Sequence, residues 1–142
     1  MHLLRRIFAA VVLLATATPV LAAPVARHHM IAAANPYAAQ AGLQILRAHG
    51  SAVDAAIAAQ LVLTLVEPES SGIGGGAFMM LYDPATKKIT SFDGRETAPA
   101  SATPSMFLDA SGKPRPHFDA VPGGLSVGVP GVVAMLELAH ER

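Results

Sequence analysis

The tetrapeptide Asp93-Gly94-Arg95-Glu96 has the residue types that could bind a carboxylate. An arginine guanidinium donates two parallel hydrogen bonds to a carboxylate, and a flanking acid such as Asp93 or Glu96 can hold it in place. Gly94 permits an unusual backbone angle, which would let Arg95 project from the end of a strand into a cleft. From these residues alone, a structural ion pair is the more common interpretation and carboxylate binding is the alternative.

A glycine-rich stretch, Gly72-Ile73-Gly74-Gly75-Gly76-Ala77, matches the spelling of the dinucleotide-binding motif G-x-G-x-x-A. That motif requires a strand before it and a helix after it, so that the pyrophosphate meets a helix N-terminus. Here the expected order is reversed, with a helix before and a strand after. The glycines are instead expected to let the backbone pass close to another segment, or to present amide N–H groups to a substrate.

The sequence gives little support for a different nucleophile or for a metal site. Ser70-Ser71 does not lie in a G-x-S-x-G motif, and the absence of cysteine excludes a thiol nucleophile, a disulfide and a zinc–thiolate site. No third metal-ligating residue accompanies His28-His29 in the sequence, so neither a metal nor a cofactor is expected. His49 and His140 are expected near helix ends, where they complement the helix dipole.

The composition excludes several classes of protein. The chain has 142 residues, with 10 Lys and Arg against 10 Asp and Glu, and only 14% of its residues are charged. A nucleic-acid-binding surface would need a clustered basic face, which this balance does not favour. The apolar share of 52% is ample for a core, and the length allows one domain at most.

The first 22 residues are expected to be a signal peptide. Arg5 and Arg6 form a positive region, and residues 7–17 form an uncharged apolar stretch. Val20-Leu21-Ala22 supplies the small residues that a signal peptidase reads, which predicts cleavage after Ala22. An uncleaved membrane anchor is the alternative, although the apolar stretch is short for a bilayer span. The expected location is periplasmic or secreted, with no membrane contact after cleavage.

The elements that must position these residues begin with a short strand at 30–34 and a pair of helices. Asn35-Pro36 predicts a helix start, and Gly50 predicts its end. Ser51 with Asp54 resembles a capping box that opens a second helix. Glu67-Pro68 ends it, since the residue before proline avoids helical angles. The first helix carries Ala39, Leu43 and Leu46 at helical spacing, and Val53, Ile57 and Leu61 form the expected buried stripe of the second.

The rest of the chain predicts a β-hairpin, a long loop and a last helix. The hairpin strands are expected at 77–82 and 88–92, and the five prolines within residues 94–122 predict a loop or short turns. Residues 123–129 are expected to form a short strand, and Pro130-Gly131 to open the last helix. That helix has no C-cap signal before Arg142, which favours an N-terminal piece of a longer protein.

Several of these segments together resemble the start of the γ-glutamyltranspeptidase family. The matching blocks come in the family's order and span about residues 29–142. They are Asn35-Pro36, Ala38-Ala39-Gln40-Ala41-Gly42, Gly50-Ser51-Ala52-Val53-Asp54-Ala55-Ala56, Val66-Glu67-Pro68, residues 70–78, residues 93–99 and Gly128-Val129-Pro130-Gly131.

The resemblance implies an exported enzyme of the N-terminal nucleophile hydrolase class, with an α/β (α+β) fold that is a fragment of an αββα sandwich. Family members are made as one precursor that cleaves itself into a large and a small subunit. The freed N-terminal Thr of the small subunit attacks a γ-glutamyl amide such as glutathione, and its own α-amine is the base. The acyl group then passes to water, an amino acid or a peptide.

The resemblance also implies which residues this piece contributes. Arg95 matches the family arginine that binds the donor α-carboxylate, and Glu96 matches a neighbouring acid that orients it. Residues 23–142 would be the truncated N-terminal part of the large subunit, so the missing small subunit is an expected partner. No catalytic residue is expected here, because none of the candidate threonines resembles the family's cleavage site: Thr64, Thr86, Thr90, Thr97 and Thr103.

Two alternatives to a γ-glutamyltransferase or glutathione hydrolase remain open at this point. One is a cephalosporin acylase of the same superfamily, whose substrate carries a glutaryl-type side chain. The other is a non-catalytic remnant or binding module. The piece by itself is expected to be inactive, since both the Thr nucleophile and the oxyanion donors would lie downstream.

Overall fold

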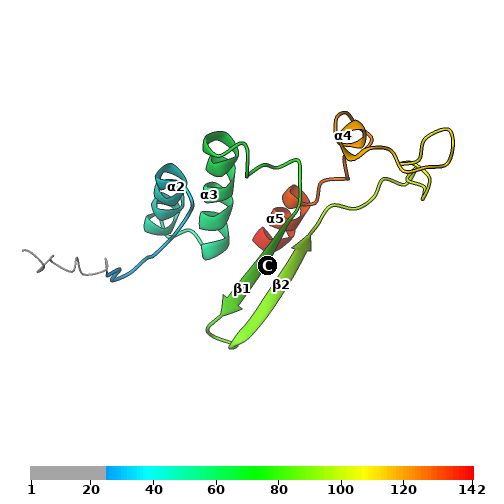
Figure 1. Ribbon diagram of the computed structural model, residues 1–142. Helices are drawn as coiled ribbons and strands as arrows, with labels where there is room; N and C mark the ends of the chain where they lie inside the picture. The colour runs from blue at the N-terminus through cyan, green and yellow to red at the C-terminus, as the bar shows by residue number, and fades with distance from the viewer. Residues whose placement is uncertain (1–24) are drawn as a thin grey trace, which may run out of the picture.

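The computed structural model describes residues 25–142, so the expected signal peptide at 1–22 lies outside the described residues. Figure 1 shows two neighbouring helices, a β-hairpin with a helix against it, and a long excursion between the hairpin and that helix. The elements in chain order are α2 (Pro36–Arg47), α3 (Ala52–Val66), β1 (Ala77–Asp83), β2 (Lys88–Gly94), α4 (His117–Ala120) and α5 (Val132–His140).

Helix α2 begins and α3 ends at the same polar contact. The Asn35 side chain accepts a hydrogen bond from the Tyr37 backbone N–H at 3.0 Å, which confirms the predicted N-cap. Its amide also donates to Glu67 Oε1 at 2.9 Å, and Glu67 is the residue at which α3 ends. One side chain therefore caps the first helix and ties it to the end of the second.

The start of α3 is the predicted capping box. Ser51 Oγ accepts from the Asp54 backbone N–H at 3.0 Å, and Asp54 Oδ2 accepts from the Ser51 backbone N–H at 2.9 Å. These bonds satisfy two backbone donors that a helix start leaves free. The Ser51 backbone N–H, followed by its hydroxyl, lowers the pKa of Asp54 because both stabilise the carboxylate.

The joint between the two helices corrects one prediction. Helix α2 ends at Arg47, and the left-handed position after it is His49, with φ of 65°, and not Gly50. Gly50 is required for space: a Cβ there would lie 2.5 Å from Ile45 Cγ2 and 3.1 Å from Ile45 O. The predicted strand at 30–34 is also wrong, because this segment is irregular and passes along the two helices.

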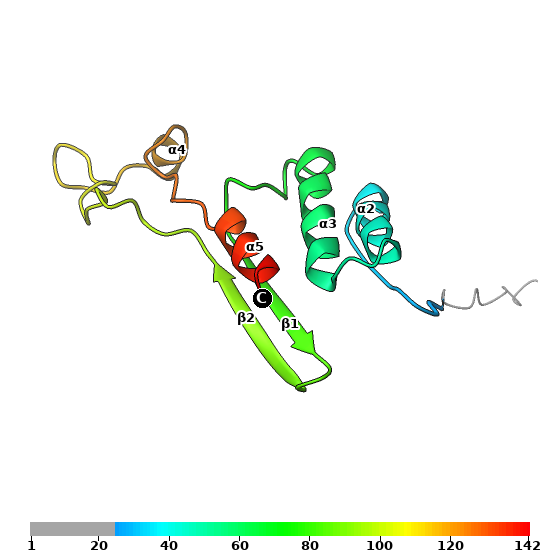
Figure 2. The same cartoon turned by 180° about the vertical axis from the view of Figure 1, so that it is seen from behind.

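Strands β1 and β2 form the predicted antiparallel hairpin, with Ala77 opposite Gly94 and Asp83 opposite Lys88. One face of the hairpin carries Phe92, which joins the buried core together with Val53 of α3. From α5 the core takes Val132, Met135, Leu136 and Ala139. The core thus lies between one sheet face, α5 and the first half of α3, and the views of Figures 1 and 2 agree on this arrangement.

Two further predictions fail for the same reason. Residues 123–129 form no strand: Val129 makes an isolated bridge with Thr97 and the preceding residues turn. Leu61 of α3 is 52% exposed although its spacing predicted burial. In both places the apolar side chains would be buried only against a neighbouring layer, and the described residues do not form such a layer.

The described residues contain a mixture of helices and one two-stranded antiparallel sheet. The α+β class is therefore confirmed in its coarse form, while membership of an αββα sandwich stays a prediction, because residues 25–142 do not form such layers by themselves. None of the helices within residues 25–142 has the length and apolar character needed to cross a membrane.

Candidate functional site

Arg95 follows directly after the end of β2, as its position in the tetrapeptide predicted. Its backbone N–H donates to Asp93 Oδ1 at 2.9 Å, so this aspartate holds the backbone of Arg95 and not its guanidinium. The guanidinium faces Glu96 instead, with 3.8 Å between Arg95 Nε and Glu96 Oε2. The Arg95 side chain is 70% exposed, and among the described residues its guanidinium makes no hydrogen bond that would occupy the fork.

Gly94 has a different role from the predicted one. Its backbone angle is not left-handed, but a Cβ at this position would lie 2.7 Å from Met135 Cβ and 3.1 Å from the carbonyl oxygen of Gly131. Glycine is therefore needed because α5 packs directly on the end of β2. This close packing fixes the strand end from which Arg95 leaves the sheet.

Arg95 and Glu96 line an open cavity of about 340 Å³. Its other walls come from the segment after β2 and from the segment before α5. They are Thr97, Ala98, Pro99, Ala102, Met106, Phe107 and residues 125–128. The lining combines the Arg95 guanidinium and the Glu96 carboxylate with small, apolar and hydroxyl side chains, so a short ligand with an anionic end would have its partner in Arg95.

The glycine-rich loop, residues 72–76, lies next to the Arg95–Glu96 ion pair. Backbone at Gly76 passes so close to the Glu96 carboxylate that a Cβ there would overlap it, and a Cβ on Gly75 would lie 3.3 Å from Glu96 Oε1, which is a tight contact. This confirms the predicted close approach to another segment. The loop follows α3 and precedes β1, so the strand–loop–helix order of a dinucleotide site does not occur here.

Ser70 and Ser71 lie in the turn after α3, where both backbone N–H groups donate to the carbonyl of Glu67. No hydrogen bond joins either hydroxyl to a histidine among the described residues. The pKa of Asp83 and that of Asp109 are lowered, chiefly by the Thr86 and Ser111 hydroxyls respectively. Both aspartates stabilise turns, and neither lines the cavity at Arg95.

His140 makes a contact that the sequence pattern did not predict. Its Nδ1 lies 2.8 Å from Asp54 Oδ1, which joins the end of α5 to the start of α3. The pairing spans 86 positions, so no local signal could have found it. Within residues 25–142 no cluster of three or more potential ligands could hold a metal ion, and the rings of His28 and His29 lie 6.5 Å apart.

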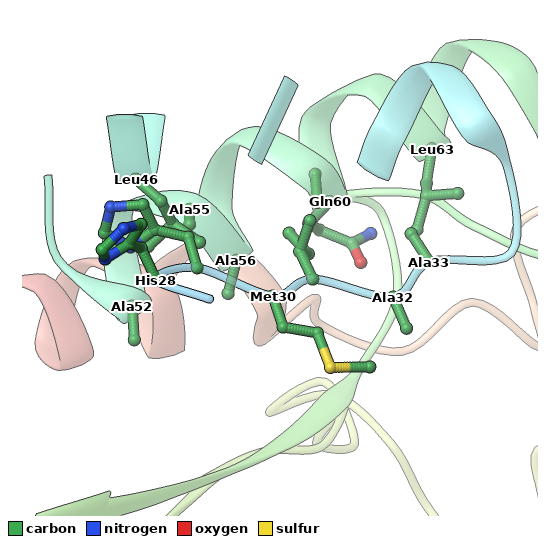
Figure 3. Close-up of a pocket in the computed structure, with 13 residues that line it drawn as sticks. His28, Met30, Ala32, Ala33, Leu46, Ala52, Ala55, Ala56, Gln60 and Leu63 are labelled. Carbon is green, nitrogen blue, oxygen red and sulfur yellow. The ribbon is translucent and has the colours of Figure 1, made fainter. Parts of the chain in front are cut away.

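A second cavity, of about 500 Å³, lies between residues 28–33 and α3. Figure 3 shows this segment passing the side chains of α3, with His28 and Met30 beside the helix. Its lining is dominated by alanine and contains no acid and no arginine. It offers space without the acid or arginine that would bind a charged substrate, whereas the smaller cavity contains Arg95 of the predicted tetrapeptide and is therefore the candidate site.

Comparison with known proteins gives the family. The model of the γ-glutamyltranspeptidase family matches residues 38–142. The chain is 49% identical over 118 residues to the glutathione hydrolase proenzyme of Bacillus subtilis strain 168, covering 83% of this chain and 20% of that relative. The chain therefore spans about a fifth of the length of this curated relative.

Solved structures agree with the sequence comparison. The γ-glutamyltranspeptidase of Pseudomonas nitroreducens, complexed with L-DON, matches with a TM-score of 0.75 and 38% identity, covering 83% of this chain and 34% of that one. The Helicobacter pylori γ-glutamyltranspeptidase matches with a TM-score of 0.77 and 34% identity, covering 84% and 34%. The folded segment of residues 25–142 is thus similar to the N-terminal part of these enzymes, and the chain belongs to the γ-glutamyltranspeptidase family.

Proposed function

We propose that this chain is the N-terminal part of the large subunit of an exported γ-glutamyltransferase or glutathione hydrolase. In the whole protein, a Thr outside this segment would attack the γ-glutamyl amide and release the amine. The resulting ester would then be cleaved by water or by the amine of an acceptor. This segment would contribute binding, and no residue of it takes part in bond making.

The role proposed for Arg95 is to bind the α-carboxylate of the donor. The observation that carries it is the Arg95 guanidinium in the lining of a small cavity: its side chain is 70% exposed, it makes no hydrogen bond within residues 25–142, and Asp93 accepts from the backbone of Arg95 instead. The ion pair with Glu96 has 3.8 Å between Arg95 Nε and Glu96 Oε2, which is too long for a hydrogen bond, so this contact leaves the N–H groups of the guanidinium able to donate to a ligand. An arginine fork matches a carboxylate better than a lysine does, because two parallel N–H groups meet two oxygens.

A γ-glutamyl donor is favoured over the glutaryl donor of a cephalosporin acylase. A glutaryl group keeps the corresponding carboxylate and lacks only the α-amine, so Arg95 would have a partner on either donor and the choice does not depend on it. The relative from Bacillus subtilis is named a glutathione hydrolase proenzyme, which supports the γ-glutamyl donor.

The test uses the full-length, matured protein that carries this segment. Arg95→Ala leaves the donor carboxylate without its partner, and loss of one member of such a pair costs about 2–5 kcal/mol. We expect kcat/KM for γ-glutamyl-p-nitroanilide to fall by tens- to thousands-fold, with partial rescue by Arg95→Lys. The matched control is Arg47→Ala, which removes an exposed arginine of α2 outside the cavity and should change little.

The decisive comparison uses a second donor, γ-aminobutyryl-p-nitroanilide, in which hydrogen replaces the α-carboxylate. Arg95→Ala should reduce its turnover little further. Equal proportional losses on the two donors would show that Arg95 supports folding or maturation and does not bind the carboxylate. Better turnover of a glutaryl donor than of the γ-glutamyl donor by the unmodified protein would favour the acylase.

A further inference from the structure

The carboxylate of Glu96 lies in a slot whose walls are glycine backbone. A Cβ on Gly75 would lie 3.3 Å from Glu96 Oε1, and one on Gly128 would lie 2.9 Å from Glu96 Cβ. A Cβ on Gly76 would overlap Glu96 Oε2 and lie 2.8 Å from Glu96 Cδ. Side chains at Gly76 and Gly128 would collide with Glu96, and one at Gly75 would press on its carboxylate, so the slot depends on these glycines.

The walls of the slot are held by hydrogen bonds from two directions. The carbonyl of Gly75 accepts from the backbone N–H groups of Gly131 and Val132, at 3.1 and 3.3 Å, at the start of α5. On the other side, Thr97 and Val129 exchange backbone hydrogen bonds of 3.2 and 2.9 Å. Moving the loop away from an added methyl group would strain these bonds, whereas the Glu96 carboxylate is the end of a flexible side chain, so Glu96 is the group that moves.

Oε2 is the oxygen of Glu96 that faces Arg95 Nε, and it is also the atom that an added Cβ on Gly76 would displace. A Cβ there would in addition lie 3.0 Å from Arg95 Cα. We propose that Gly76, with Gly75 as the second wall, is a positioning residue for the donor site: it seats Glu96 and thereby aims the Arg95 guanidinium. This inference rests on the proposed function of Arg95.

Three consecutive glycines provide a graded experiment. Gly74 has no atom within 4 Å of its Cβ position, Gly75 has one contact at 3.3 Å, and Gly76 has an overlap. None of the three has a left-handed φ, so alanine introduces no backbone strain. In the full-length, matured protein we expect Gly74→Ala to match the unmodified protein, Gly75→Ala to show a small loss, and Gly76→Ala a large one.

The readout is kcat/KM for γ-glutamyl-p-nitroanilide compared with γ-aminobutyryl-p-nitroanilide, which has no α-carboxylate. Because a displacement of about 1 Å can cost up to about a hundredfold, Gly76→Ala should lower kcat/KM for the first donor by about tenfold to a hundredfold. The loss should appear mainly in KM, and the second donor should be nearly unaffected. If Gly76→Ala yields no folded protein, the test compares Gly75→Ala with Gly74→Ala on the same two donors. A loss for Gly75→Ala that is confined to the γ-glutamyl donor supports the inference, and no such loss overturns it.

A second arm tests whether the effect passes through Glu96. In a Glu96→Ala background the carboxylate is gone, so adding Gly76→Ala should cost much less than it does alone. Full additivity, or equal losses on both donors, would overturn the inference. If Arg95→Ala discriminates the donors and Gly76→Ala does not, only the inference fails. If Arg95→Ala does not discriminate them, the proposed function itself fails.

Discussion

At the residue scale, Asp93 and Glu96 contact different parts of Arg95. Asp93 accepts the backbone N–H of Arg95 and so fixes the direction in which the chain leaves β2. Glu96 faces the guanidinium from a half-buried slot, at 35% side-chain exposure. The two acids are symmetric in the sequence about Gly94-Arg95, but only one of them faces the charged end of the arginine.

This difference gives a prediction for Asp93. Asp93→Ala removes the acceptor for the Arg95 N–H, and the net value of such a bond is about 0.5–1.5 kcal/mol. We expect kcat/KM for the γ-glutamyl donor to fall severalfold in the full-length protein. Asp93→Asn keeps an oxygen acceptor without the charge, so it should restore most of the activity. An asparagine variant as impaired as the alanine variant would mean that the charge of Asp93 acts on the substrate.

At the element scale, the start of α3 combines a capping box with a contact from α5. Asp54 uses Oδ2 for the Ser51 N–H and Oδ1 for His140, so one carboxylate serves both the helix and its packing partner. A helix N-terminus also favours negative charge, because the first backbone N–H groups point toward it. These contacts are exposed, and they stabilise the fold only while the carboxylate is ionised.

The direction in which pH changes the stabilisation by this cap can be predicted. Hydrogen bonds from Ser51 lower the pKa of Asp54 below 3.8 in the folded state. The unfolded chain therefore binds the proton more readily, and the stabilisation is present above the unfolded pKa and lost as the pH falls through the folded pKa. Ser51→Ala should reduce the free energy of unfolding by about 1 kcal/mol at neutral pH and less at pH values below the folded pKa of Asp54.

Urea denaturation of the full-length protein with and without Ser51→Ala, at neutral and acid pH, measures this difference. Ser105→Ala is a matched control, because Ser105 lies in the loop and caps no helix. Its effect should be small at both pH values. A Ser51→Ala effect that is the same at both pH values would show that the hydroxyl acts without the Asp54 charge.

At the scale of the whole molecule, the described residues leave much apolar surface uncovered. Alternate residues of β1 are exposed on the sheet face away from α5: Phe78 is 67% and Met80 72% exposed, with Tyr82 next along the strand. Leu65 of α3 is also exposed, and the segment with α4 extends away from the core in Figure 2. Contiguous apolar surface of this kind marks an interface, and without a partner it favours aggregation.

The isolated chain of 142 residues should therefore be marginally stable and inactive. We expect no turnover of γ-glutamyl-p-nitroanilide above background, since none of its threonines has the context of a freed N-terminal nucleophile. Urea denaturation and a turnover assay of the purified chain measure both properties. Turnover, or cooperative unfolding with a free energy above about 5 kcal/mol, would contradict this prediction.

Export is a prediction about the segment that the structure does not describe. The positive residues Arg5 and Arg6 and the apolar stretch after them predict cleavage after Ala22. N-terminal sequencing of protein recovered from the periplasm or medium should begin at Ala23-Pro24-Val25. Recovery of protein with an intact Met1 from the membrane fraction would favour the uncleaved anchor.

The sequence by itself determined the local elements of this protein. The cap at Asn35, the box at Ser51 and Asp54, the end of α3 at Glu67 and the hairpin all depend on contacts within a few residues. Such contacts leave a spacing that can be read directly. The family followed from blocks in a fixed order, and Arg95 became the candidate binding residue because its neighbours belong to one of those blocks.

Only the tertiary structure decided how these elements meet. The slot for Glu96 joins backbone from residues 75–76 and 128, the contact of His140 with Asp54 joins α5 to α3, and Gly94 is required by α5. Each depends on the distance between segments far apart in the chain, which no local spacing encodes. For the same reason the predicted strands at 30–34 and 123–129 were wrong: a strand needs a partner, and its own residues do not specify where that partner lies.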